Sequence, residues 1–243
     1  MSQAIRINKF IAERIGLSRR EADAAILAGK VLINGKPATI GVKIDENDKV
    51  CYNEKVVPFQ AHFSYLMMNK PVGYVCSRKA QGDTPTIYDL LPQKYYHLKT
   101  VGRLDKDSSG LILLTDDGDF AFHMTHPKFA KTKRYQVVLD HDLTETDKAT
   151  IEKGVEIGDG ISRLSLQLDN KNNNHNNSNS FNKQNHAKKS STRTHWLVTM
   201  SEGRNRQIRR TFGALGYTVV KLHRIEFGNY KLKNLQTGQF KQK

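Results

Sequence analysis

The sequence has few cysteines and no long apolar segment. Its two cysteines, Cys51 and Cys76, form neither a CxxC pair nor a metal-ligand spacing, so they fit free thiols in a reducing cytoplasm better than a disulfide framework. No apolar run approaches the roughly 18 residues that a transmembrane helix needs. The first ten residues, MSQAIRINKF, lack the apolar centre of a secretion signal. We therefore expect a cytoplasmic protein with no membrane partner.

Acidic residues are also scarce relative to basic ones. The 243 residues include 24 Asp and Glu against 39 Lys and Arg, which gives a net charge of +15. Such an excess favours a polyanionic partner, with nucleic acid ahead of an acidic membrane surface. The charge is uneven, because residues 188–243 hold 13 basic and 2 acidic side chains, whereas residues 1–60 hold 10 and 7. The strongest positive surface is therefore expected in the C-terminal part.

Residues 1–53 have the pattern of a small α/β module. The segment INKFIAERI places apolar residues at helical spacing, and SRREADAAILAG begins with a Ser-x-x-Glu capping box and ends at a glycine. The segment VLING predicts a strand that enters an Asn-Gly hairpin turn, and a further strand is expected near 49–53. Basic side chains on one face are candidate RNA contacts, although a solvated basic helix explains the charges equally well. These candidates are Arg14, Arg19, Arg20 and Lys30.

The remaining chain predicts a linker at 54–63 and a larger domain at 64–243. Runs rich in β-branched and aromatic residues predict strands at YLMMNK, RYQVVLD, HWLVTM and YTVVKLHRIEF. The segment NRQIRRTFGALG predicts a helix that stops at Gly216. Within residues 170–193, Asn fills 9 of the 16 positions from 170 to 185, which leaves too little apolar area to offset the entropy of ordering. We expect this tract to be a disordered insertion.

The segment VGRLDKDSSGLILLTDDGD, residues 101–119, gathers five aspartates around an apolar run. One interpretation is calcium binding, because Asp105, Asp107, Ser109, Gly110 and Asp116 fall at positions 1, 3, 5, 6 and 12 of an EF-hand loop. The context is unfavourable, since KTVG does not predict an entering helix and LILLT predicts a buried strand.

Other interpretations of the same segment remain open. A nucleophile at Ser108 or Ser109 lacks the GxSxG elbow. Most of the acids are expected to shape turns, with Asp107 and the serines bonding backbone amides, Asp116–Gly118 forming a hairpin and Asp119 capping a helix. The last alternative is a single catalytic aspartate at the end of a β segment.

Four segments carry a resemblance to a known family. NKPVGYVCS, GRLDKDSSGLILLTDDGD, KRYQVVL and EGRNRQIRRTFGALGYTVVKLHRIEFG resemble, in order and spacing, the bacterial RsuA/RluB/RluE/RluF ribosomal RNA pseudouridine synthases over nearly all of residues 63–230. Residues 5–53 resemble the small RNA-binding module of ribosomal small-subunit protein S-four. The resemblance implies an α+β protein, in which this module precedes a catalytic domain built on a mainly antiparallel mixed sheet.

The resemblance also implies roles for individual residues. Asp105 is the essential acid, Arg209 its basic partner, and Tyr135 the ring that lies against the target base. Ile208 is expected beside the base, and Arg103 in the space that a flipped nucleotide leaves. Without the resemblance, Arg209 would be a phosphate contact, Tyr135 and Ile208 core residues, and Arg103 a salt-bridge partner. Phosphate contacts are expected at Arg204, Arg206, Arg210, Lys70, Lys221 and Arg224.

The expected function is the isomerisation of a specific uridine in ribosomal RNA, either naked or in a ribosome assembly intermediate. The reaction implied by the resemblance needs no cofactor and no metal. The segment CSRKAQGDTPTIYDLLP looks slightly closer to large-subunit-modifying members than to small-subunit ones. The alternative is a non-catalytic assembly factor that keeps only the RNA surface. We expect a monomer.

Overall fold

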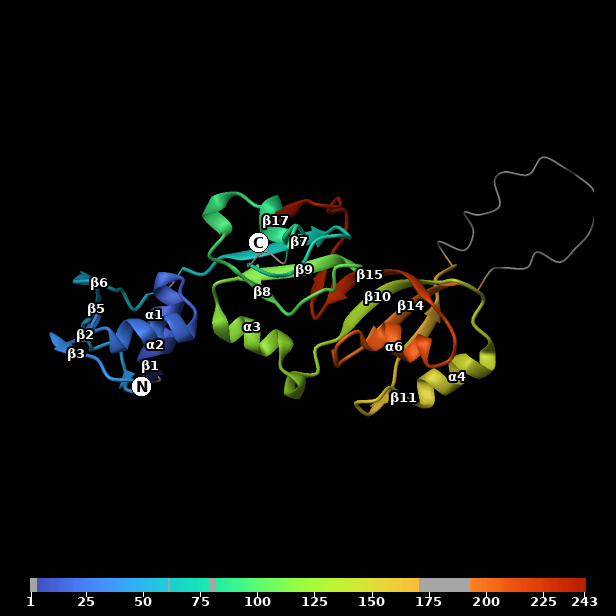
Figure 1. The fold of residues 1–243 in the computed structure, drawn as a ribbon, viewed down its shortest axis with the longest axis horizontal. Coiled ribbons are helices and arrows are strands. Elements are labelled where there is room, and N and C mark those ends of the chain that lie inside the picture. Colours follow the sequence, from blue (N-terminus) through green and yellow to red (C-terminus); the bar gives the residue numbers. More distant parts are fainter. Residues whose placement is uncertain (1–3, 61, 79–81, 171–192) are drawn as a thin grey trace, which may run out of the picture.

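The computed structural model describes residues 4–60, 62–78, 82–170 and 193–243. Most of the Asn-rich tract, residues 171–192, lies outside the described residues. Figure 1 shows the N-terminal module at one end of the long axis and the larger domain along the rest of it. Within the described ranges, no helix is long and apolar enough to cross a bilayer.

The N-terminal module packs two helices on short strands, as the sequence predicts. Ser18 and Glu21 form the predicted capping box, in which the Ser18 hydroxyl accepts from Glu21 N–H and the Glu21 carboxylate accepts from Ser18 N–H. The turn at Asn34 and Gly35 has φ of 52° and 80°, the left-handed conformation that these residues tolerate. The elements are β1 (Ile5–Arg6), α1 (Ile7–Ile15), α2 (Arg19–Leu27), β2 (Val31–Ile33), β3 (Lys36–Pro37), β4 (Lys43–Ile44), β5 (Val50–Tyr52) and β6 (Lys55–Val56).

This module has its own core. Ile7, Phe10 and Ile11 of α1 are fully buried against residues of α2 and the sheet. Strand β6 pairs with β5, and Val57 belongs to the same core. The packed structure of the module therefore continues past residue 53, where the sequence predicts the linker to begin.

The larger domain is built on nine described strands that form one mixed sheet. The main path runs β13-β14-β10-β15-β9-β7-β17, with β16 beside β15 and β8 beside β9. Among these strands, β15 and β9 pair in parallel and the other neighbours are antiparallel, which confirms the expected sheet. The strands are β7 (Tyr65–Lys70), β8 (Lys99–Val101), β9 (Ser109–Thr115), β10 (Lys133–Leu139), β13 (Ser165–Leu168), β14 (His195–Met200), β15 (Val219–Phe227), β16 (Tyr230–Lys231) and β17 (Phe240–Gln242).

Strand β9 is buried on both faces, which is why residues 111–114 are all apolar. Side chains alternate between the faces of a strand, so Leu111 and Leu113 join one core and Ile112 and Leu114 join another. The first core includes Met124 of α3 (Gly118–Thr125), and the second includes Ile87 of the 3-10 helix η1 (Ile87–Leu90). Figure 1 shows α3 below the sheet at β9.

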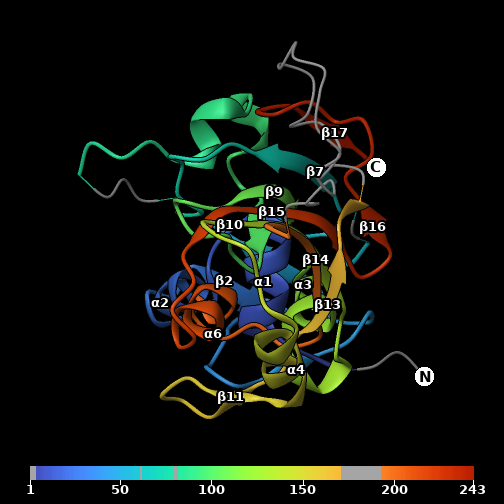
Figure 2. The same cartoon turned by 90° about the vertical axis from the view of Figure 1, so that its right-hand side faces the viewer.

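The other half of the sheet is covered by α4 (Glu145–Lys153) and α6 (Gln207–Gly213), which Figure 2 shows on one side of β10 and β14. Helix α6 ends before the predicted stop at Gly216, although that glycine does adopt a left-handed φ of 88°. A short hairpin, β11 (Val155–Glu156) with β12 (Ile161–Ser162), contacts α6 through a hydrogen bond from Gln207 to the Ser162 hydroxyl. The remaining 3-10 helices are η2 (Gln93–Tyr95) and η3 (Pro127–Phe129).

The module and the larger domain contact each other through α1, α3 and β8. The Lys9 ammonium lies 2.6 Å from the Asp119 carboxylate of α3. Lys99 of β8 donates to the Leu17 carbonyl at 2.9 Å. These contacts hold the first turn of α1 and the loop that follows α1 against the larger domain.

Candidate active site

A cavity of about 460 Å³ lies between the Asp105 turn, β10, β15 and the segment that leads into α6. Its volume is in the range of small-ligand sites, roughly 300–1,000 Å³. It is bordered by β15, which pairs antiparallel with β10 and parallel with β9. The described residues that line it include Arg103, Leu104, Asp105, Tyr135, Met200, Arg206, Ile208, Leu222, Arg224 and Phe227.

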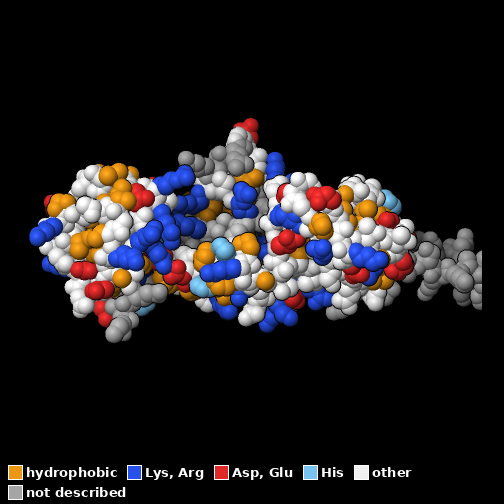
Figure 3. Space-filling model, turned by 90° about the horizontal axis from the view of Figure 1, so that it is seen from below, with side chains coloured by type: hydrophobic (Ala, Val, Ile, Leu, Met, Phe, Trp, Pro, Cys, Tyr) orange, Lys and Arg blue, Asp and Glu red, His pale blue; other side chains and the backbone are white. Residues whose placement is uncertain are grey.

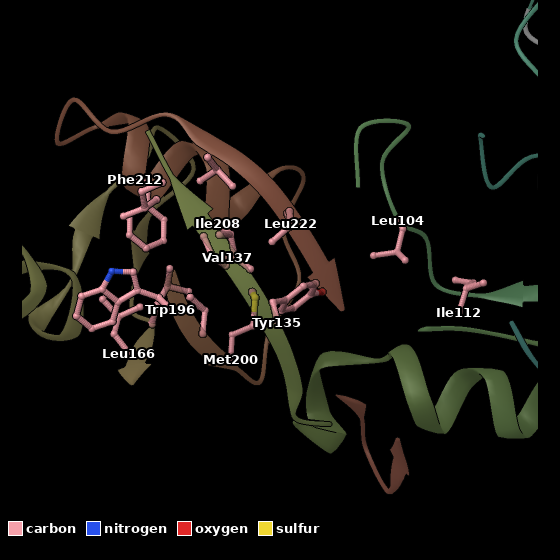
Figure 4. Packing of buried hydrophobic residues seen from close by; sticks show 14 of the residues in the cluster. Leu104, Ile112, Tyr135, Val137, Leu166, Trp196, Met200, Ile208, Phe212 and Leu222 are labelled. Carbon is pink, nitrogen blue, oxygen red and sulfur yellow. The ribbon is translucent and has the colours of Figure 1, made fainter. Parts of the chain in front are cut away.

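One wall of the cavity is apolar and comes from the domain core. Tyr135 and Ile208 are 7% and 4% exposed, and both line the cavity. Figure 4 shows the Tyr135 ring at the edge of the cluster that faces Leu104, with Ile208, Leu222 and Met200 behind it. A flat ring backed by aliphatic side chains is a suitable surface for a planar base.

Asp105 lines the same cavity, next to Leu104, which Figure 4 shows across from Tyr135. It follows Leu104, which is 7% exposed and anchors the turn in the core, and the Leu104 N–H points to Cys76 Sγ at 3.4 Å. The Asp105 side chain keeps 34% exposure, so its carboxylate is accessible from the cavity. The nearest cation is Arg206, with Nη1 3.8 Å from Asp105 Oδ2.

Arg209 does not make the predicted ion pair with Asp105. Its Nε lies 3.1 Å from Asp107 Oδ2, and its two terminal nitrogens donate to the carbonyls of Asp107 and Val219. Its side chain is 14% exposed and holds the backbone of the turn through the Asp107 carbonyl. In this arrangement the guanidinium within 4 Å of the Asp105 carboxylate is that of Arg206.

Arg206 and Asp107 form the contact that joins the Asp105 turn to α6. Both terminal nitrogens of Arg206 donate to the Asp107 carboxylate, at 3.1 and 3.0 Å. Burial alone would raise the pKa of Asp107, but these hydrogen bonds and the charges of Arg209 and Arg206 lower it overall. Arg206 also has φ of 47°, a left-handed conformation that costs a non-glycine residue about 1–3 kcal/mol. Asp107 is thus an ion-pair partner rather than the predicted amide cap.

The cationic residues of the larger domain that were predicted to contact RNA differ in their exposure and in their partners. Arg103 is exposed on the cavity rim, and no carboxylate in the described residues pairs with it. Arg204 and Arg210 instead hold the β11–β12 hairpin, because both bind Asp159 and donate to the Ile161 and Ile157 carbonyls respectively. These two arginines are engaged within the protein, contrary to the prediction. Lys221 is exposed.

Two other predicted phosphate contacts are buried. Lys70 is 0% exposed and donates to the carbonyls of Pro71 and Ser108 beneath the turn, so it cannot reach a phosphate from this position. Burial lowers the pKa of its ammonium. Arg224 is 2% exposed, donates from Nε to Leu111 O at 2.7 Å and stacks over Phe227 at 4.8 Å. Its side chain lines the floor of the cavity rather than a surface.

The basic residues of the module also divide. Arg19, Arg20 and Lys30 are exposed on α2 and the turn that follows it. Arg14 is half-buried, donates to the Phe59 carbonyl from Nε and Nη2, and lies over the Phe10 ring. Arg14 therefore stabilises the end of the module, contrary to its predicted place on an RNA-binding face.

The other aspartates of residues 101–119 differ from their predicted roles. Asp117, not Asp119, caps α3 by accepting from Phe120 N–H at 2.9 Å. Asp116–Gly118 leads into this helix instead of forming a hairpin, and Asp116 accepts from Ser64 N–H. The EF-hand interpretation fails because residues 109–115 form β9. Across the described residues, no group of three or more His, Cys, Asp or Glu side chains has the arrangement of a metal site.

Ser109, one of the two candidate serine nucleophiles, lies next to a histidine. Ser109 Oγ lies 2.8 Å from His223 Nδ1, a possible base that the sequence did not identify. Both residues lie where β9 crosses β15, and neither lines the cavity. Ser108 lines the cavity but is 1% exposed. The Ser109–His223 hydrogen bond therefore joins β9 to β15 and lies outside the cavity.

Sequence reasoning missed Lys133 and Phe227. Lys133 lines the cavity, donates to the Glu202 carbonyl at 3.0 Å and lies 5.5 Å from the Phe227 ring centre. Burial and the nearby Arg224 charge lower its pKa. The signal was available, because Lys133 lies two residues before Tyr135 on the same strand and alternate residues share a face.

Comparisons with known proteins agree with this arrangement. A sequence profile of RNA pseudouridylate synthases matches residues 64–214, and an S4 domain profile matches residues 5–50. The chain is 34% identical to ribosomal small subunit pseudouridine synthase A of Haemophilus influenzae, over 98% of this chain and 95% of that protein. It is also 34% identical to ribosomal large subunit pseudouridine synthase B of Bacillus subtilis, over 96% and 89%.

A solved structure agrees over the same length. The crystal structure of a pseudouridylate synthase superposes with a TM-score of 0.63 at 32% identity, and covers 98% of this chain and 95% of that one. The family profile matches more than half of the chain, and the sequence relatives and the solved structure cover almost all of it. This chain therefore belongs to the RNA pseudouridylate synthase family.

Proposed function

We propose that this protein isomerises a specific uridine in ribosomal RNA to pseudouridine, with Asp105 as the catalytic residue. The observation that carries the proposal is that the accessible Asp105 carboxylate and the Tyr135 ring line the same cavity. The similar proteins of Haemophilus influenzae and Bacillus subtilis are named for ribosomal subunits, which supports ribosomal RNA as the substrate.

The reaction requires three things of the site. The bond between the sugar and the uracil nitrogen breaks, the base turns, and carbon 5 bonds to the same sugar carbon. Carbon 5 releases its proton, and the freed ring nitrogen takes up one. Substrate and product are isomers, so the atoms balance without a co-reactant. A uridine inside folded RNA must first leave its stack, which costs a few kcal/mol.

The proposed division of labour follows the geometry. The ionised Asp105 attacks the anomeric carbon or removes a sugar proton, and either step needs its negative charge. Arg206 places a guanidinium 3.8 Å from that carboxylate. Tyr135 and Ile208 hold the uracil, because stacking tolerates rotation of the base. Arg103, exposed at the rim, is positioned to contact the RNA around the vacated space.

The remaining expectations are proposals of the same kind. The S4 module supplies placement through Arg19, Arg20 and Lys30, and residues 64–243 supply the chemistry. We propose action in the cytoplasm as a monomer, on naked RNA or on an assembly intermediate. A preference for large-subunit RNA remains a prediction, since the similar proteins act, by their names, on both subunits.

Replacement of Asp105 by Asn tests the mechanism. The amide keeps the shape and removes the charge, so isomerisation should fall by roughly a thousandfold or more while RNA binding changes little. The measurement is tritium release from uridine labelled at carbon 5, in transcripts and ribosomal particles of each subunit. A variant that isomerises at the wild-type rate would exclude the aspartate mechanism. A wild-type protein that binds every substrate and isomerises none would favour the non-catalytic assembly factor.

A further inference from the structure

A group of rings on α3 and η3, exposed except for the half-buried Phe129, takes no part in the chemistry described above. The group consists of Phe122, His123, His126 and Phe129, with Lys128 among them, and is called the α3–η3 cluster below. Phe122 is 42% exposed, and the two histidines and Lys128 are also exposed. Figure 3 views this side of the molecule and shows hydrophobic and histidine side chains gathered around blue ones near its middle.

The rings of the cluster pack on one another. His123 and Phe129 have ring centres 4.5 Å apart at 37°, and Phe122 and His126 have centres 4.7 Å apart at 53°. Phe122 meets Phe129 edge to face at 5.7 Å. The Lys128 ammonium lies 5.2 Å from the Phe122 ring and 4.7 Å from the Phe129 ring. Rings and charge are thus held in one fixed arrangement.

Burial in the protein does not explain these rings. Phe120 and Ala121 of the same helix pack against the core beneath α3, whereas Phe122 and Phe129 belong to none of the three hydrophobic cores of the described residues. Exposed aromatic side chains that contact each other and a lysine resemble the surfaces on which unpaired bases stack.

The cluster is continuous with the rim of the active-site cavity. Thr125 and Pro127 line the cavity and lie between Phe122 and Phe129 in the chain. Thr125 also lies against Gly102, since a methyl group added at Gly102 would be 3.5 Å from Thr125 Cγ2. An RNA strand that places one nucleotide beside Asp105 therefore has its neighbours within reach of the cluster.

We propose that the α3–η3 cluster stacks an unpaired base of the RNA next to the nucleotide that enters the cavity. The rings bind the base face, and Lys128 neutralises the adjoining phosphate. The inference rests on the proposed function and adds a second subsite to it. This subsite holds the strand after the target nucleotide leaves the stack, so its contribution is to substrate binding rather than to the chemical step.

The test removes the rings and separates binding from chemistry. The variant Phe122→Ala with Phe129→Ala is compared with Phe122→Tyr with Phe129→Tyr, which keeps both rings. Tyr96→Ala is the matched control, because Tyr96 is 45% exposed and does not line the cavity. The dissociation constant is measured with end-labelled ribosomal RNA transcripts, and KM and kcat by tritium release.

The double alanine variant should raise the dissociation constant and KM about tenfold for each base that stacks, and leave kcat within twofold. The tyrosine variant and the Tyr96 control should match the wild type. Stacking releases few counterions, so the slope of log affinity against log salt should not change in the alanine variant.

Three results would overturn the proposal. The first is RNA binding by the alanine variant within twofold of the wild type, and the second is an equal loss of affinity in the tyrosine variant. The third is a loss of affinity for ribosomal particles but not for transcripts, which would indicate a protein partner. A wild-type protein that binds transcripts and ribosomal particles but isomerises neither would refute the proposed function alone, because the dissociation constants still report on stacking.

Discussion

Asp105 and Asp107 lie two residues apart on one turn, and their surroundings give them different tasks. Asp105 has one cation at 3.8 Å and an open side toward the cavity. Asp107 accepts two hydrogen bonds from Arg206 and an ion pair from Arg209. We therefore interpret Asp107 as a positioning residue that holds the turn against α6.

Replacement of Asp107 by Asn tests this role. The lost contacts should let the turn shift, and a misplacement of about 1 Å costs roughly a hundredfold, so kcat should fall ten- to a hundredfold. Because the pKa of Asp107 is lowered in the folded protein, its stabilisation is present above the unfolded value near 3.9 and is lost as pH falls through the folded value. The variant should thus show a smaller loss of stability on acidification than the wild type.

The matched control for Asp107 is Asp140→Asn. Asp140 also has a lowered pKa, from its hydrogen bond to the Thr218 amide, and it lies outside the cavity. The Asp140→Asn variant should leave kcat unchanged. Equal kcat values for the Asp107 variant and the wild type, measured by tritium release, would show that the turn needs no such anchor.

The site residues show how far sequence reasoning reaches at this scale. The family resemblance selected Asp105, Tyr135 and Ile208, and the structure places all three in one cavity, although their roles remain predictions. It assigned Arg209 to Asp105, whereas the Arg209 guanidinium pairs with Asp107, two residues further along the same turn, because the packing of α6 against the turn decides between them. Charge also could not reveal that Lys70 is enclosed, since burial depends on the strands around it.

At the scale of elements, the parallel pairing of β9 with β15 depends on one glycine. Gly110 has φ of 106°, and a Cβ atom there would lie 2.3 Å from the Arg224 carbonyl oxygen. The neighbouring atom is backbone in a paired strand, so it cannot give way. The close approach brings Arg224 and the Asp105 turn to the same cavity.

The variant Gly110→Ala should therefore be severely destabilised, by about 3 kcal/mol or more in the free energy of unfolding. Gly213→Ala in α6 is the control, since its φ is not positive and nothing lies within 4 Å of the added carbon. That change should be neutral or stabilise by about 0.4–1 kcal/mol. Denaturant unfolding compares the two, and a Gly110 variant as stable as the wild type would mean that the strands can separate at this point.

Elements with strong periodicity were predictable, and those set by tertiary contacts were not. The strands β7, β9, β10, β14 and β15 follow from apolar and β-branched runs, and α2 follows from its capping box. Helix α3 was misread at its start, because DDGD has the residues of a turn and of a helix cap alike. Asp117 is the residue that caps α3, and its carboxylate also accepts a hydrogen bond from the hydroxyl of Tyr65. Tyr65 lies 52 residues away in sequence, so a local pattern does not reveal this contact.

On the scale of the whole molecule, the placement of the S4 module relates its cations to the cavity. Glu13 of α1 lies close to the start of α3, since a Cβ atom at Gly118 would be 2.8 Å from Glu13 Oε1. Burial raises the pKa of Glu13, and Lys9 opposes this effect. Lys9 thus neutralises a group of acids at the junction, which includes Asp119. We infer that this docking fixes the span between α2 and the site.

Reversal of the Lys9 charge tests whether the docking serves substrate binding. Lys9→Glu would place a further carboxylate beside Glu13 and Asp119, and this repulsion should release the module. Since the cavity does not include Lys9, KM for transcripts should rise severalfold while kcat stays close to the wild type. Adding Asp119→Lys restores an opposite pair and should recover most of the affinity. If the double reversal binds as weakly as Lys9→Glu alone, Lys9 contacts the RNA itself and the span between α2 and the cavity is not set at this junction.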